Sequence, residues 1–238
     1  METSALHSRL RPLLWLGVAF VAVSTLTRLV LLIAAGSGVP ATLGNWAYLF
    51  GVGLGYDLLA FVYFAWPLVL VLWVLPRRWL ARRPGSFIVG ALCLLLLFVV
   101  LFVAVSEWTF WEEFQARFNF IAVDYLVYTT EVIGNIRESY PIGLILSSLA
   151  LVTGGVFIAT RRWRLVRNDS AGFGARSLVV AGWLAAGVLG TWLVSGDMKD
   201  RTANTYVNEL AGNGIYQFFA AYRSASLDYA RYYRTVPA

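Results

Sequence analysis

The chain alternates between long apolar runs and short polar connectors. The runs are 13–35, 48–75, 87–105, 142–160 and 177–195, and they contain only two charged side chains. Each can cross the ~30 Å hydrocarbon core of a bilayer as a helix that rises ~1.5 Å per residue. The pattern therefore predicts an all-α polytopic membrane protein with five transmembrane helices.

The first two runs are longer than the other three. The first exceeds the ~7–15 apolar residues of a signal peptide, so we expect it to be retained as a helix. The second, 48–75, is too long for a straight crossing. It must tilt, project beyond the membrane or bend at Pro67.

The basic residues lie mainly on one side of the predicted spans. The net charge of +6 comes from 18 Arg and one Lys, and eleven of the arginines fall at the same end of the predicted bundle. This bias predicts a cytoplasmic N-terminus, 1–12, and places 196–238 outside. It also explains the positive charge without nucleic-acid binding. The eleven are Arg9, Arg11, Arg77, Arg78, Arg82, Arg83, Arg161, Arg162, Arg164, Arg167 and Arg176.

The longest loop between spans, 107–141, carries aromatic residues at helical spacing. They predict an amphipathic helix in the outer membrane interface, with an ion pair between Glu113 and Arg117 one helical turn apart. Such a helix seals the rim of the bundle or lines a lipid head-group pocket. The rim residues are Trp108, Trp111, Phe114, Arg117 and Phe118.

Residues 196–238 are rich in aromatics but not apolar enough to span a membrane. Their spacing predicts short amphipathic helices with a break at 212–214. We expect this segment to be an extracytoplasmic stalk or linker.

Two ionisable residues, Arg28 and Asp57, lie at similar depth within the first two runs. An unpaired charge there costs at least ~2.5–3.5 kcal/mol, so we expect the two to pair. A structural ion pair, a contact to a lipid phosphate at Arg28 and an ion relay are the alternatives.

Small residues flank both charges and predict close helix packing. Ser24 and Gly53 each precede a charge by one helical turn, and Gly51 and Gly55 form a small-x-x-x-small pair.

Residues that usually carry catalysis or bind metals are scarce. Cys93 is the only cysteine and lies inside the third run, while the only histidine, His7, lies in the N-terminal segment. Cysteine-based metal sites and histidine-dependent triads are therefore not predicted. We assign no catalytic residue and no metal ligand.

Several sequence runs resemble one family of bacterial envelope proteins. They are similar to the membrane half of lipoteichoic acid synthase-like and phosphoglycerol transferase-like proteins, also described as sulfatase-like. The runs are GYDL at 55–58, FQARFNFIAVDYLVY at 114–128, EV at 131–132, NIRESYP at 135–141, NELAGNGIYQFF at 208–219 and LDY at 227–229.

The resemblance implies a module in a bacterial inner membrane. In this family, five membrane helices precede an extracytoplasmic domain of the alkaline phosphatase type. That domain holds a threonine nucleophile and a divalent metal, commonly manganese, and transfers phosphoglycerol from a phospholipid. No residue here matches that apparatus, so we expect no cofactor in this chain and no turnover by it alone.

The resemblance and the residues together predict a membrane anchor that presents phospholipid to a catalytic domain. The expected partners are membrane phospholipid and a separate catalytic domain or envelope protein. One alternative is a non-enzymatic membrane protein that binds lipid or an envelope partner through its outer rim and tail. Another is a small transporter that uses Arg28 and Asp57, for which flux should depend on Asp57.

Overall fold

A computed structural model describes residues 2–80, 82–127, 129–166 and 171–225. Every regular element in these ranges is helical. The α-helices are α1 (Glu2–Ala35), α2 (Leu43–Phe64), α3 (Trp66–Val74), α4 (Arg77–Leu80), α5 (Arg83–Phe114), α6 (Phe120–Val127), α7 (Thr129–Ser139), α8 (Ile142–Ala159), α9 (Arg161–Arg164), α10 (Phe173–Leu193), α11 (Thr205–Ala211) and α12 (Gly214–Ala225). Two 3-10 turns, η1 (Gly36–Gly38) and η2 (Gly196–Lys199), complete the set.

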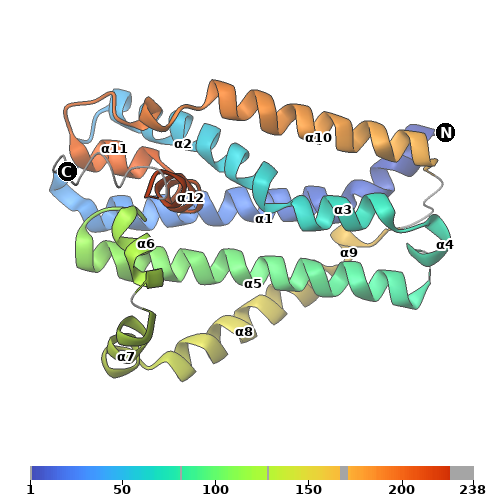
Figure 1. The fold of residues 1–238 in the computed structure, drawn as a ribbon, viewed down its shortest axis with the longest axis horizontal. Helices are drawn as coiled ribbons and strands as arrows, with labels where there is room; N and C mark the ends of the chain where they lie inside the picture. Colours follow the sequence, from blue (N-terminus) through green and yellow to red (C-terminus); the bar gives the residue numbers. More distant parts are fainter. Residues whose placement is uncertain (1, 81, 128, 167–170, 226–238) are drawn as a thin grey trace, which may run out of the picture.

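Five helical segments within the described residues are long and apolar enough to cross a membrane, which confirms the all-α polytopic architecture. In Figure 1, α1, α5 and α10 run along the long axis of the molecule, whereas α8 crosses it obliquely. α4 lies at the end of the bundle opposite α11 and α12 (Figure 1). The segments are Ser8–Gly38, Leu43–Phe64, Arg83–Phe114, Ile142–Ala159 and Phe173–Leu193.

The second apolar run is not one helix, because it breaks between α2 and α3 at Ala65. Pro67 lies in the first turn of α3, where a missing backbone N–H is tolerated because that turn has no intrahelical acceptor. Of the three alternatives for the excess length of this run, the structure therefore shows a break beside Pro67.

The core is formed mainly by α1, α2, α3 and α5, which contribute most of the fully buried apolar side chains. α8 and α10 lie at the edge of this core. In α8 only Leu149 and Thr153 are buried among the described residues, and in α10 only Gly187 is. Their exposed side chains are largely apolar, as lipid contact requires.

The predicted interfacial helix differs from the structure at its beginning. Residues from Trp108 to Phe114 continue α5, and the helix stops where Gln115 adopts a left-handed conformation with φ of 52°. Trp108 is 38% exposed, but Trp111 is fully buried and is not a rim residue. Phe118 packs edge-on against Phe110 of α5. α6 and α7 then lead to α8.

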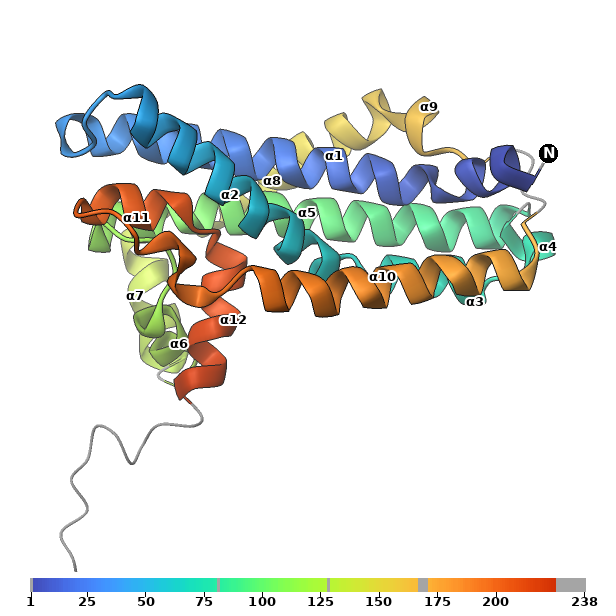
Figure 2. The same ribbon diagram turned by 90° about the horizontal axis from the view of Figure 1, so that it is seen from above.

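The described part of the predicted stalk, 196–225, packs against the bundle. α11 contacts α2 and α1, and α12 contacts α6 and α2. Figure 2 shows α12 crossing the direction of the long spans. The expected break lies where α11 ends at Ala211 and α12 begins at Gly214. The LDY run at 227–229 lies outside the described residues.

Candidate functional site

The two charges predicted to pair do so. Arg28 donates from Nη1 to Asp57 Oδ2 at 2.9 Å and from Nη2 to Asp57 Oδ1 at 3.0 Å. Arg28 is 1% exposed and Asp57 is fully buried. This two-pronged geometry is the strongest form of an arginine–carboxylate contact, because both N–H groups find a charged acceptor. The pair ties α1 to α2.

The predicted packing residues around this pair separate into two groups. Gly53 is buried, and a Cβ there would overlap the guanidinium of Arg28, so the absence of a side chain makes room for it. Ser24 is also buried. A Cβ at Gly51 or Gly55 would meet no atom of the described chain within 4 Å. The expected close approach of a neighbouring helix at Gly51 and Gly55 is therefore wrong.

The segment 196–225, which we call the tail, supplies further partners to the same pair. Arg28 Nε donates to the carbonyl of Leu210 at 2.9 Å, and its Nη2 donates to the carbonyl of Gly212 at 3.1 Å. Asn213 Nδ2 donates to Asp57 Oδ1 at 2.8 Å. With the guanidinium so engaged and 1% exposed, a lipid phosphate can reach Arg28 only after the tail withdraws.

A second buried ion pair lies close to the first. Arg117 Nε donates to Glu107 Oε2 at 2.7 Å, and the two residues are 1% and 4% exposed. The predicted pairing of Arg117 with Glu113 is wrong, because α5 ends before residue 117 and the chain turns back at Gln115. Arg117 is therefore a core residue and not part of an exposed rim.

The carbonyl of Gly212 joins the two ion pairs. It accepts hydrogen bonds from Arg28 and from Arg117, which lie on different segments of the bundle. Gly214 follows directly beside the carboxylate of Glu107, and a Cβ at 214 would overlap that group. The chain between α11 and α12 thus fits between the two ion pairs only because position 214 has no side chain.

A third ion pair extends the cluster toward solvent. Lys199 Nζ donates to Glu209 Oε1 at 2.6 Å, and the other oxygen of Glu209 accepts the backbone N–H of Arg117 at 3.1 Å. Each of the three cations in this group thus contacts a carboxylate. We define the tail clamp as Arg28, Asp57, Glu107, Arg117, Lys199, Glu209 and the loop 210–214.

Tyrosines on α2 hold the connection between α10 and the tail. Tyr56 donates its hydroxyl to the carbonyl of Ser195 at 2.7 Å. About two turns earlier on the same helix, Tyr48 donates to the carbonyl of Met198 at 2.8 Å. The ring of Tyr216 on α12 lies 4.9 Å from that of Tyr56. α2 therefore contacts the beginning of this connection, at Ser195 and Met198, and also α12, at Tyr216.

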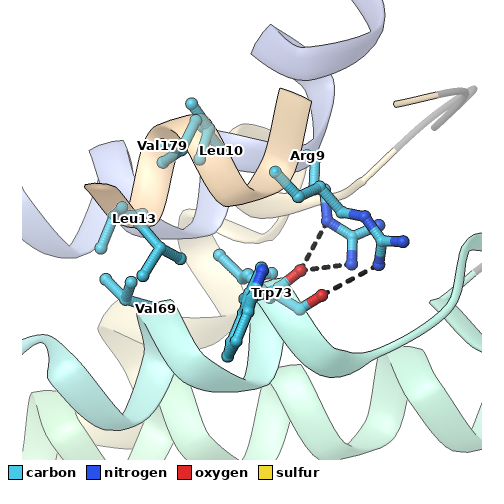
Figure 3. Close-up of a pocket in the computed structure, with 9 residues that line it drawn as sticks. Arg9, Leu10, Leu13, Val69, Trp73 and Val179 are labelled. Carbon is cyan, nitrogen blue, oxygen red and sulfur yellow. Dashed lines mark hydrogen bonds between the residues drawn. The ribbon is translucent and has the colours of Figure 1, made fainter. Parts of the chain in front are cut away.

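The opposite end of the bundle contains a different arginine arrangement, shown in Figure 3. Arg9 donates from Nε to the carbonyl of Leu72 at 2.6 Å and also reaches the carbonyl of Leu75. Arg176 donates to the carbonyls of Trp73 and Leu75 at 2.9 and 3.0 Å. Cations at a helix C-terminus satisfy its last carbonyl groups and interact favourably with the negative end of its dipole. Two arginines read as topology signals thus also cap α3.

The cavity beside these arginines is small. It has a volume of about 20 Å³ and is lined mostly by apolar side chains. That is room for about one water molecule and far too little for an organic ligand. Arg9 and Arg176 therefore stabilise the end of α3 and do not form a ligand site there.

The described residues add no candidate for catalysis. No group of three or more His, Cys, Asp or Glu residues in the described ranges has the arrangement of a metal site. Cys93 is fully buried in the apolar core. The expectation that this chain binds no cofactor stays a prediction.

Glu107 and the tail loop were missed in the sequence. One signal for Glu107 was present, because Glu107, Phe110, Trp111 and Phe114 recur at the spacing of one helical face.

Comparisons with models of protein families, with curated proteins and with solved structures found no match. The resemblance to phosphoglycerol transferases therefore depends on the sequence runs alone.

Proposed function

We propose that this chain is the membrane anchor and lipid-presenting module of a phosphoglycerol-transferase-like enzyme of the bacterial cell envelope. The observation that carries the proposal is the tail clamp, in which the carbonyl of Gly212 accepts from two buried arginines. A segment held in this way emerges from the bundle in one fixed direction. Such a segment suits a module that positions a domain relative to the membrane surface.

The energetics support a rigid attachment. Leaving a buried hydrogen-bonding group without its partner typically costs about 1–3 kcal/mol, and more when the group is charged. Arg28 and Arg117, the cations of the two buried ion pairs, both donate to carbonyls of the same loop. Release of the tail would remove these acceptors and leave the two ion pairs in place, so the closed arrangement is favoured over an open one.

The sequence runs that resemble the family include residues of the clamp. GYDL contains Asp57, the run at 114–128 contains Arg117, and the run at 208–219 contains Glu209 and the loop 210–214. The family resemblance and the tail clamp thus involve the same parts of the chain. In the proposal, catalysis belongs to a domain on the outer side, and a divalent metal such as manganese belongs to that domain.

The anchoring role is tested by hydrogen exchange of the purified chain in nanodiscs. Amides of 205–217 should be strongly protected in the native chain, and Glu107→Ala or Arg117→Ala should raise their exchange at least tenfold. Glu112→Ala, which removes an exposed carboxylate of the same helix, is the matched control and should leave the exchange unchanged. Rapid exchange of this segment in the native chain would refute a fixed tail.

The family assignment needs a separate assay. The purified chain in nanodiscs of phosphatidylglycerol should release no diacylglycerol in the presence of Mn²⁺. Turnover that persists after contaminants are removed would show that the chain itself carries a catalytic apparatus, contrary to the proposal.

The alternative of a non-enzymatic binding protein retains one supporting observation. Phe219 and Tyr222 on α12 are 63% and 55% exposed and form an aromatic surface beyond the clamp. The rim itself supports it less, since Trp111 and Arg117 are buried. Capture of an envelope partner that depends on Phe219 and Tyr222, with no associated transferase activity, would favour this alternative.

A further inference from the structure

A groove lies far from the tail clamp, between the N-terminal part of α5 and the C-terminal part of α8. It encloses about 690 Å³, which lies within the ~300–1,000 Å³ range of small-molecule sites. We call it the basic groove. The residues that line it are Leu80, Arg82, Arg83, Ser86, Phe87, Val89, Gly90, Ala91, Cys93, Leu94, Phe157, Arg161, Arg164, Leu165 and Val166.

One end of the basic groove is strongly cationic. Four arginines line it, and none of its lining residues is Asp or Glu. Arg164 is engaged, because it donates to the carbonyl of Phe157 and lies over the Phe157 ring. Within the described part of the chain, no acidic side chain pairs with Arg82, Arg83 or Arg161, and all three are exposed.

The first turn of α5 adds to this positive potential. α5 begins at Arg83, and the free backbone N–H groups of a helix N-terminus carry a partial positive charge. The hydroxyl of Ser86 lies on the same turn and lines the groove. Arg9 and Arg176 donate to carbonyls at the end of α3. Arg82, Arg83 and Arg161 instead line the groove, with no side-chain hydrogen bond to a carbonyl among the described residues.

The walls beyond the arginines are apolar. Phe87, Leu94 and Phe157 line the groove, and Phe87 is 75% exposed. Gly90 also lines the groove and has no side chain to fill it; a Cβ there would be 3.8 Å from the Phe157 ring. A cationic end joined to an apolar channel on a membrane helix matches a molecule with an anionic head and a hydrocarbon chain.

We propose that the basic groove binds an anionic phospholipid from the leaflet at the arginine-rich end of the bundle. Its phosphate contacts Arg82, Arg83 and Arg161, and an acyl chain follows the wall formed by Phe87, Leu94 and Phe157. The charge complementarity selects an anionic lipid, and the apolar wall selects a lipid over a free phosphate ion. The inference does not depend on the proposed anchoring function, because the clamp lies at the other end.

Native mass spectrometry of the purified chain tests the head-group contact. The chain should retain phosphatidylglycerol in preference to phosphatidylcholine. A hydrogen bond to a charged group typically contributes a factor of about ten in affinity, so the double variant R83Q/R161Q should bind phosphatidylglycerol at least about 25-fold more weakly. The matched control R77Q/R78Q removes two exposed arginines of the same end that do not line the groove, and should bind as the native chain does.

A second pair of variants tests the chain contact without changing charge. Gly90→Leu fills the groove and should reduce phosphatidylglycerol retention at least fivefold. Gly155→Leu places the same side chain on α8 where a Cβ would meet no atom within 4 Å, and should have no effect. Circular dichroism and thermal unfolding establish that all four variants are folded.

Three outcomes would overturn the proposal. Equal loss in R83Q/R161Q and R77Q/R78Q would show non-specific attraction of anionic lipid to the whole end. Displacement of the lipid by soluble glycerol phosphate at equal concentration would show that the acyl chain contributes nothing. Equal retention of phosphatidylcholine and phosphatidylglycerol by the native chain would remove the role of charge.

Discussion

The geometry of the tail clamp predicts that exchanging the two charges of the Arg28–Asp57 pair will not restore stability. A simple ion pair tolerates such an exchange, because its Coulomb energy is unchanged. Here Arg28 also donates to the carbonyls of Leu210 and Gly212. In R28D/D57R, a carboxylate at position 28 would face two carbonyl oxygens, and an arginine at 57 would face the amide of Asn213.

The expected magnitudes follow from these contacts. Arg28→Ala and Asp57→Ala should each lower the free energy of unfolding by about 3–5 kcal/mol, because each leaves a buried charge without its partner. In R28D/D57R, the carbonyl of Leu210 loses its side-chain donor and that of Gly212 loses one of two, at ~1–3 kcal/mol for each lost hydrogen bond. The exchanged variant should therefore remain at least ~2 kcal/mol less stable than the native chain.

Equilibrium unfolding in mixed micelles, followed by circular dichroism and tryptophan fluorescence, measures these differences. Arg77→Ala removes an exposed arginine and should change the free energy by less than ~0.5 kcal/mol. Recovery of R28D/D57R to within ~0.5 kcal/mol of the native chain would refute the reasoning. It would mean that the guanidinium of Arg28 does not hold the tail.

Three further predictions use other parts of the structure. Gly214→Ala should lower the free energy of unfolding by ~1–3 kcal/mol, because the new methyl group overlaps a buried carboxylate, whereas Gly55→Ala should be neutral or slightly stabilising. Arg176→Ala should lower the same free energy by ~1–2 kcal/mol, measured in the same unfolding assay, because two carbonyls at the end of α3 lose a charged donor. In intact cells, a membrane-impermeant maleimide should label Arg201→Cys and leave Arg77→Cys unlabelled, and the reverse result would contradict the orientation with the N-terminus inside.

The spans were predictable because a bilayer imposes a strict length on apolar runs. Pairing of Arg28 with Asp57 was predictable for a related reason, since two isolated charges at similar depth have few other ways to be neutralised. Pro67 marked the bend for the local reason that its ring removes a backbone donor. In each case the physical constraint acts on residues that the sequence displays directly.

The position of the tail was not predictable in this way. Its partners in the clamp are largely backbone carbonyls, those of Leu210 and Gly212, and every residue type carries a carbonyl. The segment is also less apolar than a span. What it buries against the charged side chains is polar backbone, which does not appear in the pattern of apolar residues. For Arg117, local helical spacing favoured Glu113, but the turn at Gln115 redirected it to Glu107.

The separation of the clamp's parts along the chain has a consequence for biosynthesis. Arg28 lies 29 residues from Asp57 but 182 residues from Leu210. Synthesis at ~5–20 residues per second makes the carbonyl partners available roughly 10–40 s after the arginine enters the membrane. The hairpin of α1 and α2 must therefore be inserted with its charges satisfied only by each other, and closure by the tail is among the last steps of assembly.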